Sequence, residues 1–158
     1  MQIKIRPANE GDCERLLELL AQIGELHHTN RPDIFQSDLI KYNLDELRNI
    51  LNNPERPIFS AVNQDNFLVG YAFCQIINHE NHHAFINFKT LYIDDICVDE
   101  NIRNQGVGSL LLNKCKEFAK EQGCNYIELN VWEFNESAVK FYEKCGFSTR
   151  LRRMEYIL

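Results

Sequence analysis

The sequence predicts an α/β (α+β) fold: a mixed, mostly antiparallel twisted sheet of six to seven strands, flanked by about four helices. Three observations predict it. Apolar runs rich in β-branched and aromatic residues alternate with amphipathic segments of helical period. The first runs are separated by polar, turn-forming residues, which favours antiparallel pairing. Later, one strand is followed by a helix and another strand, and a right-handed crossover makes those two strands parallel neighbours.

Length and composition favour one domain, residues 1–158, because a chain of this size buries about two thirds of its unfolded surface in one core. The net charge of −6 argues against a nucleic-acid partner. No apolar run approaches the roughly 18 residues of a membrane span, and the N-terminus lacks an apolar core of signal length. We therefore expect a cytoplasmic protein without a membrane partner. The cysteines lack paired spacing and are interpreted as buried thiols: Cys13, Cys74, Cys97, Cys115, Cys124 and Cys145.

The chain begins with a short strand and a long helix. Ile3 and Ile5 alternate with polar residues, which predicts the strand. Apolar residues then recur at helical spacing from residue 13 to residue 27. Pro32 disfavours helical backbone at Arg31, so the helix is expected to end there.

A second helix and a hairpin follow. The helix is predicted over Leu39 to Leu51, with a restart at Asn43 as an alternative. The apolar runs Pro57 to Val62 and Phe67 to Ile77 are separated by the turn-forming residues 63–66, and they predict the two strands of the hairpin.

The second half of the chain alternates strands and helices. Residues 84–98 predict a strand long enough to contain a bend or bulge, and 109–122 predict an amphipathic helix. Residues 126–131 form the next expected strand, 136–145 a short helix, and 147–158 a closing strand or pair of strands.

The stretch from Arg103 to Gly108 is interpreted as a phosphate cradle between strand and helix. Gly106 and Gly108 permit backbone conformations closed to other residues and remove the Cβ atoms that would keep a ligand away. Free N–H groups in the first turn of the helix favour an anion. The stretch lacks the lysine of a P-loop and the third glycine of a dinucleotide fingerprint. A tightly packed turn remains the alternative, and the guanidinium of Arg103 favours the phosphate.

With these motifs in place, the chain resembles the GNAT superfamily of N-acetyltransferases over essentially its whole length. The family's acetyl-CoA signature is matched by Arg103, Gly106 and Gly108. The resemblance implies the GNAT fold, whose sheet splays between the strands at 91–98 and 126–131. The second signature is matched by Asn135, Ala138, Phe141, Tyr142, Gly146 and Phe147.

The strand from Tyr92 to Val98 is similar to the Leu-Glu-Asp strand of the diamine and polyamine acetyltransferases, although Asp94 replaces the usual glutamate. The resemblance implies acetyl-CoA as cosubstrate and a homodimer as a compatible assembly, since closing strands in this family often pair or exchange. The residues implied in cofactor binding are Ile96, Cys97, Val98, Arg103, Asn104, Gln105, Gly106, Val107, Gly108, Ser109, Asn130, Asn135, Ala138, Phe141 and Tyr142.

Three residues are candidates for the chemistry. A lysine-type amine must lose a proton before it attacks a thioester, so Asp94 or Asp95, directly or through water, is the candidate base. Adjacent strand residues point to opposite faces, so one of them faces the amine unless a bulge intervenes. The carboxylates could instead bind a cationic substrate or hold a loop. Tyr142 stands at the family's position for the acid that protonates the leaving thiolate.

The sequence says least about the molecule that accepts the acetyl group. We expect a small diamine, polyamine or amino-acid-like amine; a protein lysine or N-terminus, and a non-catalytic acetyl-CoA sensor, are the alternatives. The residues suggested for the acceptor wall are His27, His28, Arg31, Phe35 and Trp132. The histidines of the polar loop, His79, His82 and His83, are interpreted as solvated, and no metal is predicted.

Overall fold

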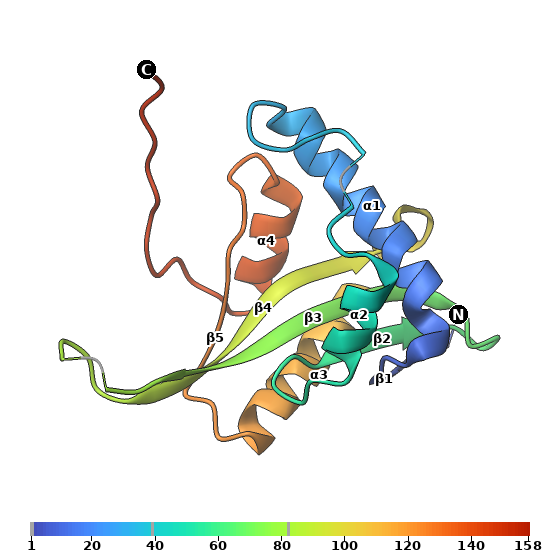
Figure 1. The fold of residues 1–158 in the computed structure, drawn as a ribbon, viewed down its shortest axis with the longest axis horizontal. Helices are drawn as coiled ribbons and strands as arrows, with labels where there is room; N and C mark the ends of the chain where they lie inside the picture. Colours follow the sequence, from blue (N-terminus) through green and yellow to red (C-terminus); the bar gives the residue numbers. More distant parts are fainter. Residues whose placement is uncertain (1, 39, 82) are drawn as a thin grey trace.

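The computed structural model describes residues 2–38, 40–81 and 83–158, and within them five strands form one sheet in the order β1-β2-β3-β4-β5 (Figure 1). The first four strands pair antiparallel, and β4 and β5 pair parallel. The expected fold class is confirmed, although the sheet has fewer strands than predicted. The strands are β1 (Lys4–Pro7), β2 (Ile58–Val62), β3 (Leu68–His79), β4 (Phe88–Val98) and β5 (Tyr126–Leu129).

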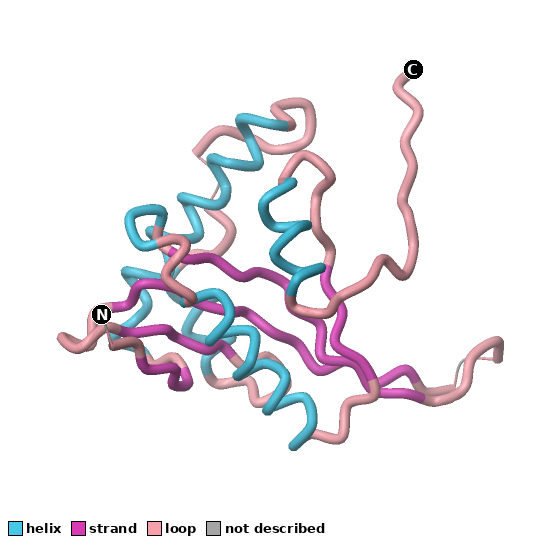
Figure 2. Tube along the Cα trace, turned by 180° about the vertical axis from the view of Figure 1, so that it is seen from behind, coloured by secondary structure: helices cyan, strands magenta, loops and turns pink. Residues whose placement is uncertain are grey.

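Helices cover both faces of the sheet (Figures 1 and 2). One face packs against α1 (Cys13–Asn30) and α2 (Leu44–Leu51), and the other packs against α3 (Val107–Glu121) and α4 (Glu136–Lys144). Two short 3₁₀ helices precede α1 and α3, at Glu10–Asp12 and Glu100–Ile102. Among the described residues, no helix combines the length and the apolar character needed to cross a bilayer.

Alternate residues of the central strands enter the two cores. In β2, Phe59 and Ala61 pack on the α3 side, whereas Ile58 and Val62 pack on the α1 side. Every residue of β2 is buried. A sheet covered on both faces explains why these strands appear in the sequence as continuous apolar runs rather than as an alternation of apolar and polar residues.

The predicted closing strand over 147–158 is wrong. This segment leaves the sheet beyond Phe147 as an extended tail without regular secondary structure (Figures 1 and 2). A strand requires a partner for its backbone hydrogen bonds, and the tail pairs with none of the five described strands, although the side chain of Arg150 hydrogen-bonds Glu128 of β5. Its large apolar side chains are consequently exposed: Leu151, Met154, Tyr156, Ile157 and Leu158.

Three element starts differ from the prediction by two residues or more. The second helix begins at Leu44, because Asn43 caps it and exchanges hydrogen bonds with Glu46. The alternative restart was therefore correct, and Leu39 lies outside the described residues. Helix α3 begins at Val107 rather than at Ser109, so Gly108 lies within its first turn. Strand β4 begins at Phe88 rather than at residue 84.

Candidate active site

A β-bulge in β4 turns Asp94 and Asp95 toward the same face of the sheet. Against β3, Ile93 pairs with Cys74 and Asp95 pairs with Phe73, so the register skips Asp94. Phe73 belongs to the core on the α1 side, which places Asp95 on that side. Ile93 packs on the α3 side, so its neighbour Asp94 also faces α1. The extra residue thus reverses the alternation that would have separated the two carboxylates.

Lys41, in the segment between α1 and α2, bridges these two carboxylates. Its Nζ atom donates hydrogen bonds to Oδ2 of Asp94 at 3.0 Å and to Oδ2 of Asp95 at 3.1 Å. The hydroxyl of Tyr42 lies 3.5 Å from the same Asp94 oxygen, and its ring stacks on Phe73. We call Lys41, Tyr42, Asp94 and Asp95 the carboxylate cluster. In this cluster a primary ammonium contacts two acids: the side chain of Asp94 is 33% exposed and that of Asp95 is 11% exposed.

Burial and charge act in opposite directions within this cluster. Burial raises the pKa of Asp95, and the attraction of Lys41 reduces that rise without cancelling it. Burial alone would lower the pKa of Lys41, but attraction to Asp95 and the hydrogen bonds to both carboxylates outweigh it, so this pKa is raised. A general base works best when its pKa lies near the working pH, and an upward shift brings the pKa of a carboxylate closer to that pH.

A buried hydroxyl beside the carboxylate cluster lacks a partner. Tyr71 is fully buried, and its hydroxyl makes no hydrogen bond to any residue that the structure describes. Its ring packs edge-to-face on Phe73. Burial raises the pKa of Tyr71, with a further contribution from the charge of Asp95. Buried polar groups are almost always satisfied, so this hydroxyl marks a place for a water or a ligand atom.

Sequence reasoning missed Lys41, Tyr42 and Tyr71. Lys41 and Tyr42 fall where a helix was expected, and Tyr71 stands in an apolar run that was interpreted as core. One signal was available for Tyr71, because strand alternation places it on the same face as Phe73. For Lys41 the sequence carries no signal, since its position depends on how a non-repetitive segment crosses the sheet.

An aromatic cluster lies between the end of α1 and the segment that joins β5 to α4. It consists of His27, Phe35, Trp132 and Phe134. The ring of Phe35 stacks on His27 with centroids 4.8 Å apart and meets Trp132 edge-on at 5.4 Å. Trp132 stacks on Phe134 at 5.7 Å. Burial lowers the pKa of His27, against the opposing charge of Asp95, which links this cluster electrostatically to the carboxylate cluster.

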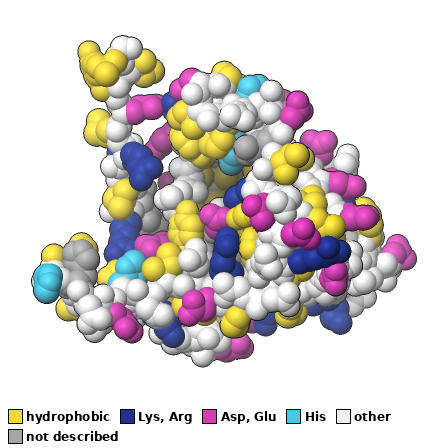
Figure 3. Space-filling model, in the orientation of Figure 1, with side chains coloured by type: hydrophobic (Ala, Val, Ile, Leu, Met, Phe, Trp, Pro, Cys, Tyr) yellow, Lys and Arg dark blue, Asp and Glu magenta, His cyan; other side chains and the backbone are white. Residues whose placement is uncertain are grey.

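The residues suggested for the acceptor wall therefore lie together, although Arg31 already has partners. Its guanidinium hydrogen-bonds Asp33 at 2.8 and 2.9 Å and Glu155 of the tail at 2.7 and 3.0 Å. It also lies over the ring of Trp132, 5.7 Å from the centroid. His28 contacts the carbonyl oxygen of Phe35 at 2.8 Å. Figure 3 shows this face hollowed between the helices and the tail, with acidic and basic side chains beside the hollow.

The loop from Arg103 to Ser109 leads to an open helix terminus. Gly106 adopts a left-handed conformation with φ of 82° and precedes α3 without supplying a side-chain cap. Asn104 is also left-handed, with φ of 64°. Gly108 is helical, so it does not need the backbone conformation closed to other residues that was expected, and a Cβ atom there would lie 3.3 Å from the ring of Phe141. Asn104, Gln105, Gly106 and Ser109 are exposed, whereas Val107 is buried.

The end of β4 is paired on one side only. Toward β3, Ile96, Cys97 and Val98 pair with Ala72, Tyr71 and Gly70. Toward β5, the described ladder ends at the pair of Ile93 with Leu129, so the backbone beyond Ile93 has no strand partner there. This is where a splay between the two strands was expected. Arg103 donates from Nε to the carbonyl of Val98 at 3.3 Å. Burial raises the pKa of Cys97 to about 12, so its thiol stays protonated at neutral pH.

Tyr142 lies on α4 with its ring in the core on the α3 side. It packs against Phe141 and Phe147, with centroids 5.2 and 5.7 Å away. Burial raises the pKa of Tyr142, and the charge of Asp95 contributes next. The phenol is therefore protonated at neutral pH.

Two predicted cofactor contacts have partners within the chain. Asn130 donates from Nδ2 to the hydroxyl of Tyr92 at 3.1 Å. Asn135 caps α4, since its Oδ1 accepts from the N–H of Ala138 at 3.2 Å and from the hydroxyl of Ser137 at 3.0 Å. Capping accounts for Asn135, and a further role in binding stays a prediction.

The histidine loop lies far from these residues in the fold, at the tip of the β3-β4 hairpin (Figure 1). His79 stacks on Phe88 at 4.1 Å, His83 is exposed, and His82 lies outside the described residues. Within 2–38, 40–81 and 83–158, no group of three or more histidine, cysteine, aspartate or glutamate side chains is arranged to hold a metal.

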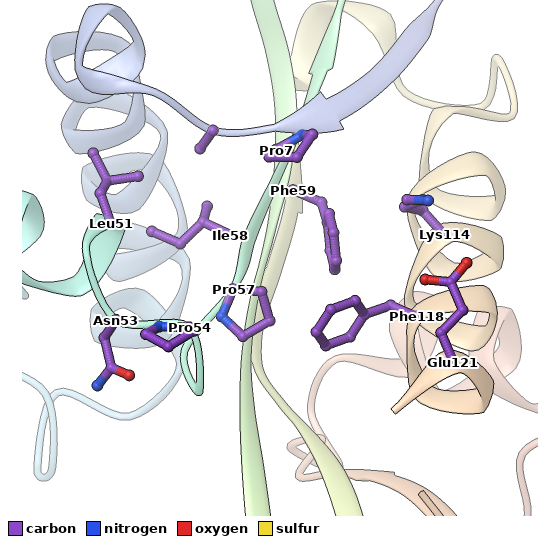
Figure 4. Close-up of a pocket in the computed structure, with 11 residues that line it drawn as sticks. Pro7, Leu51, Asn53, Pro54, Pro57, Ile58, Phe59, Lys114, Phe118 and Glu121 are labelled. Carbon is purple, nitrogen blue, oxygen red and sulfur yellow. The ribbon is translucent and has the colours of Figure 1, made fainter. Parts of the chain in front are cut away.

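A separate hollow of about 360 Å³ lies between the end of α2, the β1–β2 edge and α3 (Figure 4). Phe59 and Phe118 line its apolar wall, and Lys114 and Glu121 stand on α3 beside it. None of the residues predicted for cofactor, acceptor or catalysis lines this hollow. The chemistry-bearing groups gather instead around β4.

Comparison with known proteins agrees with this geometry. The sequence profile of the acetyltransferase (GNAT) family matches residues 20–147. The thialysine N-epsilon-acetyltransferase of Sus scrofa is 28% identical over 154 residues, covering 91% of this chain and 83% of the relative. The peptidyl-lysine N-acetyltransferase YjaB of Escherichia coli is 29% identical over 147 residues, covering 93% and 83%.

Similarity in three dimensions extends over nearly the whole chain. A solved structure of the BH1408 protein of Bacillus halodurans, a tetramutant, superposes with a TM-score of 0.94 at 28% identity, covering 98% of this chain and 99% of the other. The profile match spans well over half of the chain, and the relatives named above are N-acetyltransferases. This chain therefore belongs to the acetyltransferase (GNAT) family and is an N-acyltransferase.

Proposed function

We propose that this chain, acting as one domain, transfers an acetyl group from acetyl-CoA to a primary amine of a small diamine, polyamine or amino-acid-like molecule. The amine attacks directly in a ternary complex, without a covalent enzyme intermediate. The observation that carries this proposal is the carboxylate cluster, in which two acids brought together by the bulge hold the primary ammonium of Lys41.

The loop from Arg103 to Ser109 is suited to the phosphates of acetyl-CoA. The first N–H groups of α3 face a loop that offers no side-chain cap, and the helix dipole favours an anion there. Gly108 lets Phe141 approach the helix closely. Beyond Ile93 the edge of β4 has no strand partner toward β5, which suits backbone contacts to the amides of the pantetheine arm, and the carbonyl of Val98 on it already accepts from Arg103.

Asp94 and Asp95 supply the base. At pH 7 the removal of a proton from an amine with a pKa near 10.4 costs roughly 4 to 5 kcal/mol, and a nearby carboxylate or a water held by it reduces that cost. The upward shift of the pKa of Asp95 suits this role better than an ordinary aspartate would. One carboxylate can hold the positive charge of the acceptor while the other accepts the proton.

Tyr142 supplies the acid. Its phenol remains protonated because burial raises its pKa, and it protonates the leaving thiolate as the tetrahedral intermediate collapses. Backbone N–H groups near Ile96 to Val98 stabilise the oxyanion. Two different protons therefore move: the amine gives one proton to Asp95, and Tyr142 gives another proton to the thiolate.

The names of the relatives support an amine of lysine type. The Sus scrofa relative is named for thialysine, an amino acid, which favours a small acceptor. The Escherichia coli relative is named for peptidyl-lysine, so a protein lysine is the second candidate. The tail reaches the aromatic cluster through Glu155, which pairs with Arg31 over the ring of Trp132, and this enclosure favours the small molecule.

The tail supports a homodimer as the working assembly. Five large apolar side chains along it are exposed, and covering them with a second copy would remove that surface from water. The acidic charge gives no support to a nucleic-acid partner, and a cytoplasmic site of action fits the composition. Sedimentation of the full chain and of a chain ended after Arg150 tests the assembly: a dimer that persists without the tail contradicts it.

The experiment that tests the activity is acetyl-CoA-dependent thiol release against a panel of diamines, polyamines, lysine analogues, aminoglycosides and peptides. We expect a saturable rate with small amines that carry a second positive charge. Binding of acetyl-CoA is measured in parallel by thermal stabilisation. Stabilisation without turnover of any small amine would reject the small-amine acceptor and move the assignment to a protein lysine.

A further inference from the structure

We propose that Lys41 is a site of self-acetylation, at which the chain transfers an acetyl group to its own side chain. The inference rests on the proposed function, since it uses the same cosubstrate and the same base and acid. It assigns to Lys41 a role as an internal acceptor, held where the amine of an external acceptor must lose its proton.

The first argument is chemical identity. The Nζ atom of Lys41 is a primary amine, the group that the proposed reaction acetylates, and it contacts both candidate bases at 3.0 and 3.1 Å. Other lysines with assigned contacts are engaged elsewhere: Lys116 donates to the carbonyl of Cys145 and Lys89 to the carbonyl of Gln122. Among the described lysines, Lys41 is the one paired with Asp94 and Asp95.

The second argument is position. Asp94 and Asp95 are the first residues of β4 beyond its pairing with β5, so the contacts of Lys41 to both carboxylates place its amine where the two strands separate. The side chain of Lys41 is 30% exposed and extends from a non-repetitive segment rather than from a helix. The side chain is therefore partly accessible, and no helical backbone restrains it.

The unpartnered hydroxyl of Tyr71 is an independent observation at this place. It is fully buried, and its phenol feels the charges of Asp95 and Asp94. A hydroxyl that lacks an acceptor among the described residues offers a hydrogen bond to a carbonyl oxygen. The new amide of acetylated Lys41 would bring such an oxygen into the cluster.

The step balances without another reactant. The ammonium of Lys41 loses one proton to Asp95, and the neutral Nζ forms a bond to the thioester carbon. The carbon–sulfur bond breaks, the thiolate takes a proton from Tyr142, and the nitrogen loses its second proton to restore the phenol through solvent. The products are an amide at Lys41, CoA and one released proton. The neutral amide no longer forms an ion pair, which leaves Asp94 and Asp95 to an external ammonium.

The test is mass mapping of the full chain incubated with acetyl-CoA and no added amine. We expect acetyl occupancy at Lys41 to rise at least tenfold faster than at Lys120, an exposed lysine on α3 that reports direct chemical acetylation. The rate should not depend on protein concentration, because the transfer is intramolecular. Tyr142→Phe should slow it at least tenfold at Lys41 and leave Lys120 unchanged. A saturating amine acceptor should protect Lys41.

Two variants make the outcome unambiguous. Lys41→Arg keeps the positive charge but removes the acceptor nitrogen, and the matched control Lys120→Arg should leave the Lys41 modification unaltered. Occupancy at Lys41 that only follows Lys120, or that ignores Tyr142→Phe, overturns the inference. If external amines are acetylated while Lys41 is not, the inference fails and the proposed function stands. If neither is acetylated and acetyl-CoA does not stabilise the fold, both fail.

Discussion

The two ends of the candidate site are built in different ways. At the proposed cofactor end the phosphate loop is one contiguous stretch, Arg103 to Ser109, whose properties come from backbone conformation and from the absence of side chains at two glycines. The acceptor end gathers side chains from the end of α1, the segment before α2, the bulge of β4 and the segment after β5. Backbone chemistry is local and can be recognised by residue spacing, whereas the acceptor end exists only after distant segments have packed.

The largest expected effect lies where the two ends meet. Tyr142→Phe should lower kcat about a thousandfold while leaving the affinity for acetyl-CoA unchanged, because the ring still packs against Phe141 and Phe147 and only the proton donor is lost. Steady-state thiol release and a binding titration measure the two quantities. Equal losses of binding and of kcat would show that Tyr142 belongs to the cofactor end alone.

A charge change at the acceptor end should separate it from the cofactor end. Asp95→Asn should lower kcat/KM for a diamine about thirtyfold, since an amide neither accepts the proton nor holds an ammonium. Asp94→Asn, at the more exposed carboxylate, should cost less, and neither variant should change the affinity for acetyl-CoA. If Asp94→Asn has the larger effect, the roles of the two carboxylates are the reverse of those proposed.

The pH dependence of stability should distinguish Asp95 from a purely structural carboxylate. The pKa of Asp95 is raised above its unfolded value of about 3.9, so its contribution to stability is present below that pH and is lost as the pH rises through the folded pKa. Lys41, whose pKa is also raised, stays fully charged over this range. Asp95→Asn should therefore gain stability relative to the wild type as the pH rises above about 4.

Asp12 provides the matched control with the opposite sign. It is 5% exposed and accepts hydrogen bonds from Arg6 at 2.6 and 2.9 Å. Burial would raise the pKa of Asp12, but the hydrogen bonds from Arg6 and Asn9 outweigh it and lower this pKa. Its contribution is present above about pH 4 and is lost as the pH falls through the folded pKa. Asp12→Asn should cost about 3 kcal/mol at pH 7 and less at low pH. Parallel pH trends of the two variants in thermal unfolding would contradict this assignment.

The smallest effects should show that the two ends act independently. Gly108→Ala places a methyl group 3.3 Å from Phe141 and should weaken acetyl-CoA binding about threefold to tenfold, with the KM for the amine unchanged. Phe35→Ala, in the aromatic cluster, should raise the amine KM by a similar factor and leave acetyl-CoA binding unchanged. Isothermal titration measures the binding of acetyl-CoA, and steady-state thiol release measures the KM for the amine. If either variant also changed the binding of the other ligand, the two ends would not act independently and would belong to one pocket.

Much of the fold could be predicted from the sequence. The long amphipathic helices, the antiparallel hairpin and the parallel crossover were expected, because hydrophobic period and turn residues report local structure. The closing strand was not predictable from residues 147–158, since a strand depends on a partner that the described chain does not provide. The start of α2 was ambiguous, because the sequence before Asn43 contains no signal that excludes a helix there.

The sequence by itself determined the glycine loop, the open helix terminus and the presence of two acids on one strand, because each of these follows from residue type at a fixed spacing. Only the tertiary structure decided that both acids face α1, that Lys41 lies between them and that Tyr71 is left without a partner. The physical reason is register. A single extra residue in β4 reverses the side-chain alternation, and only the pairing with β3 determines where that residue is placed.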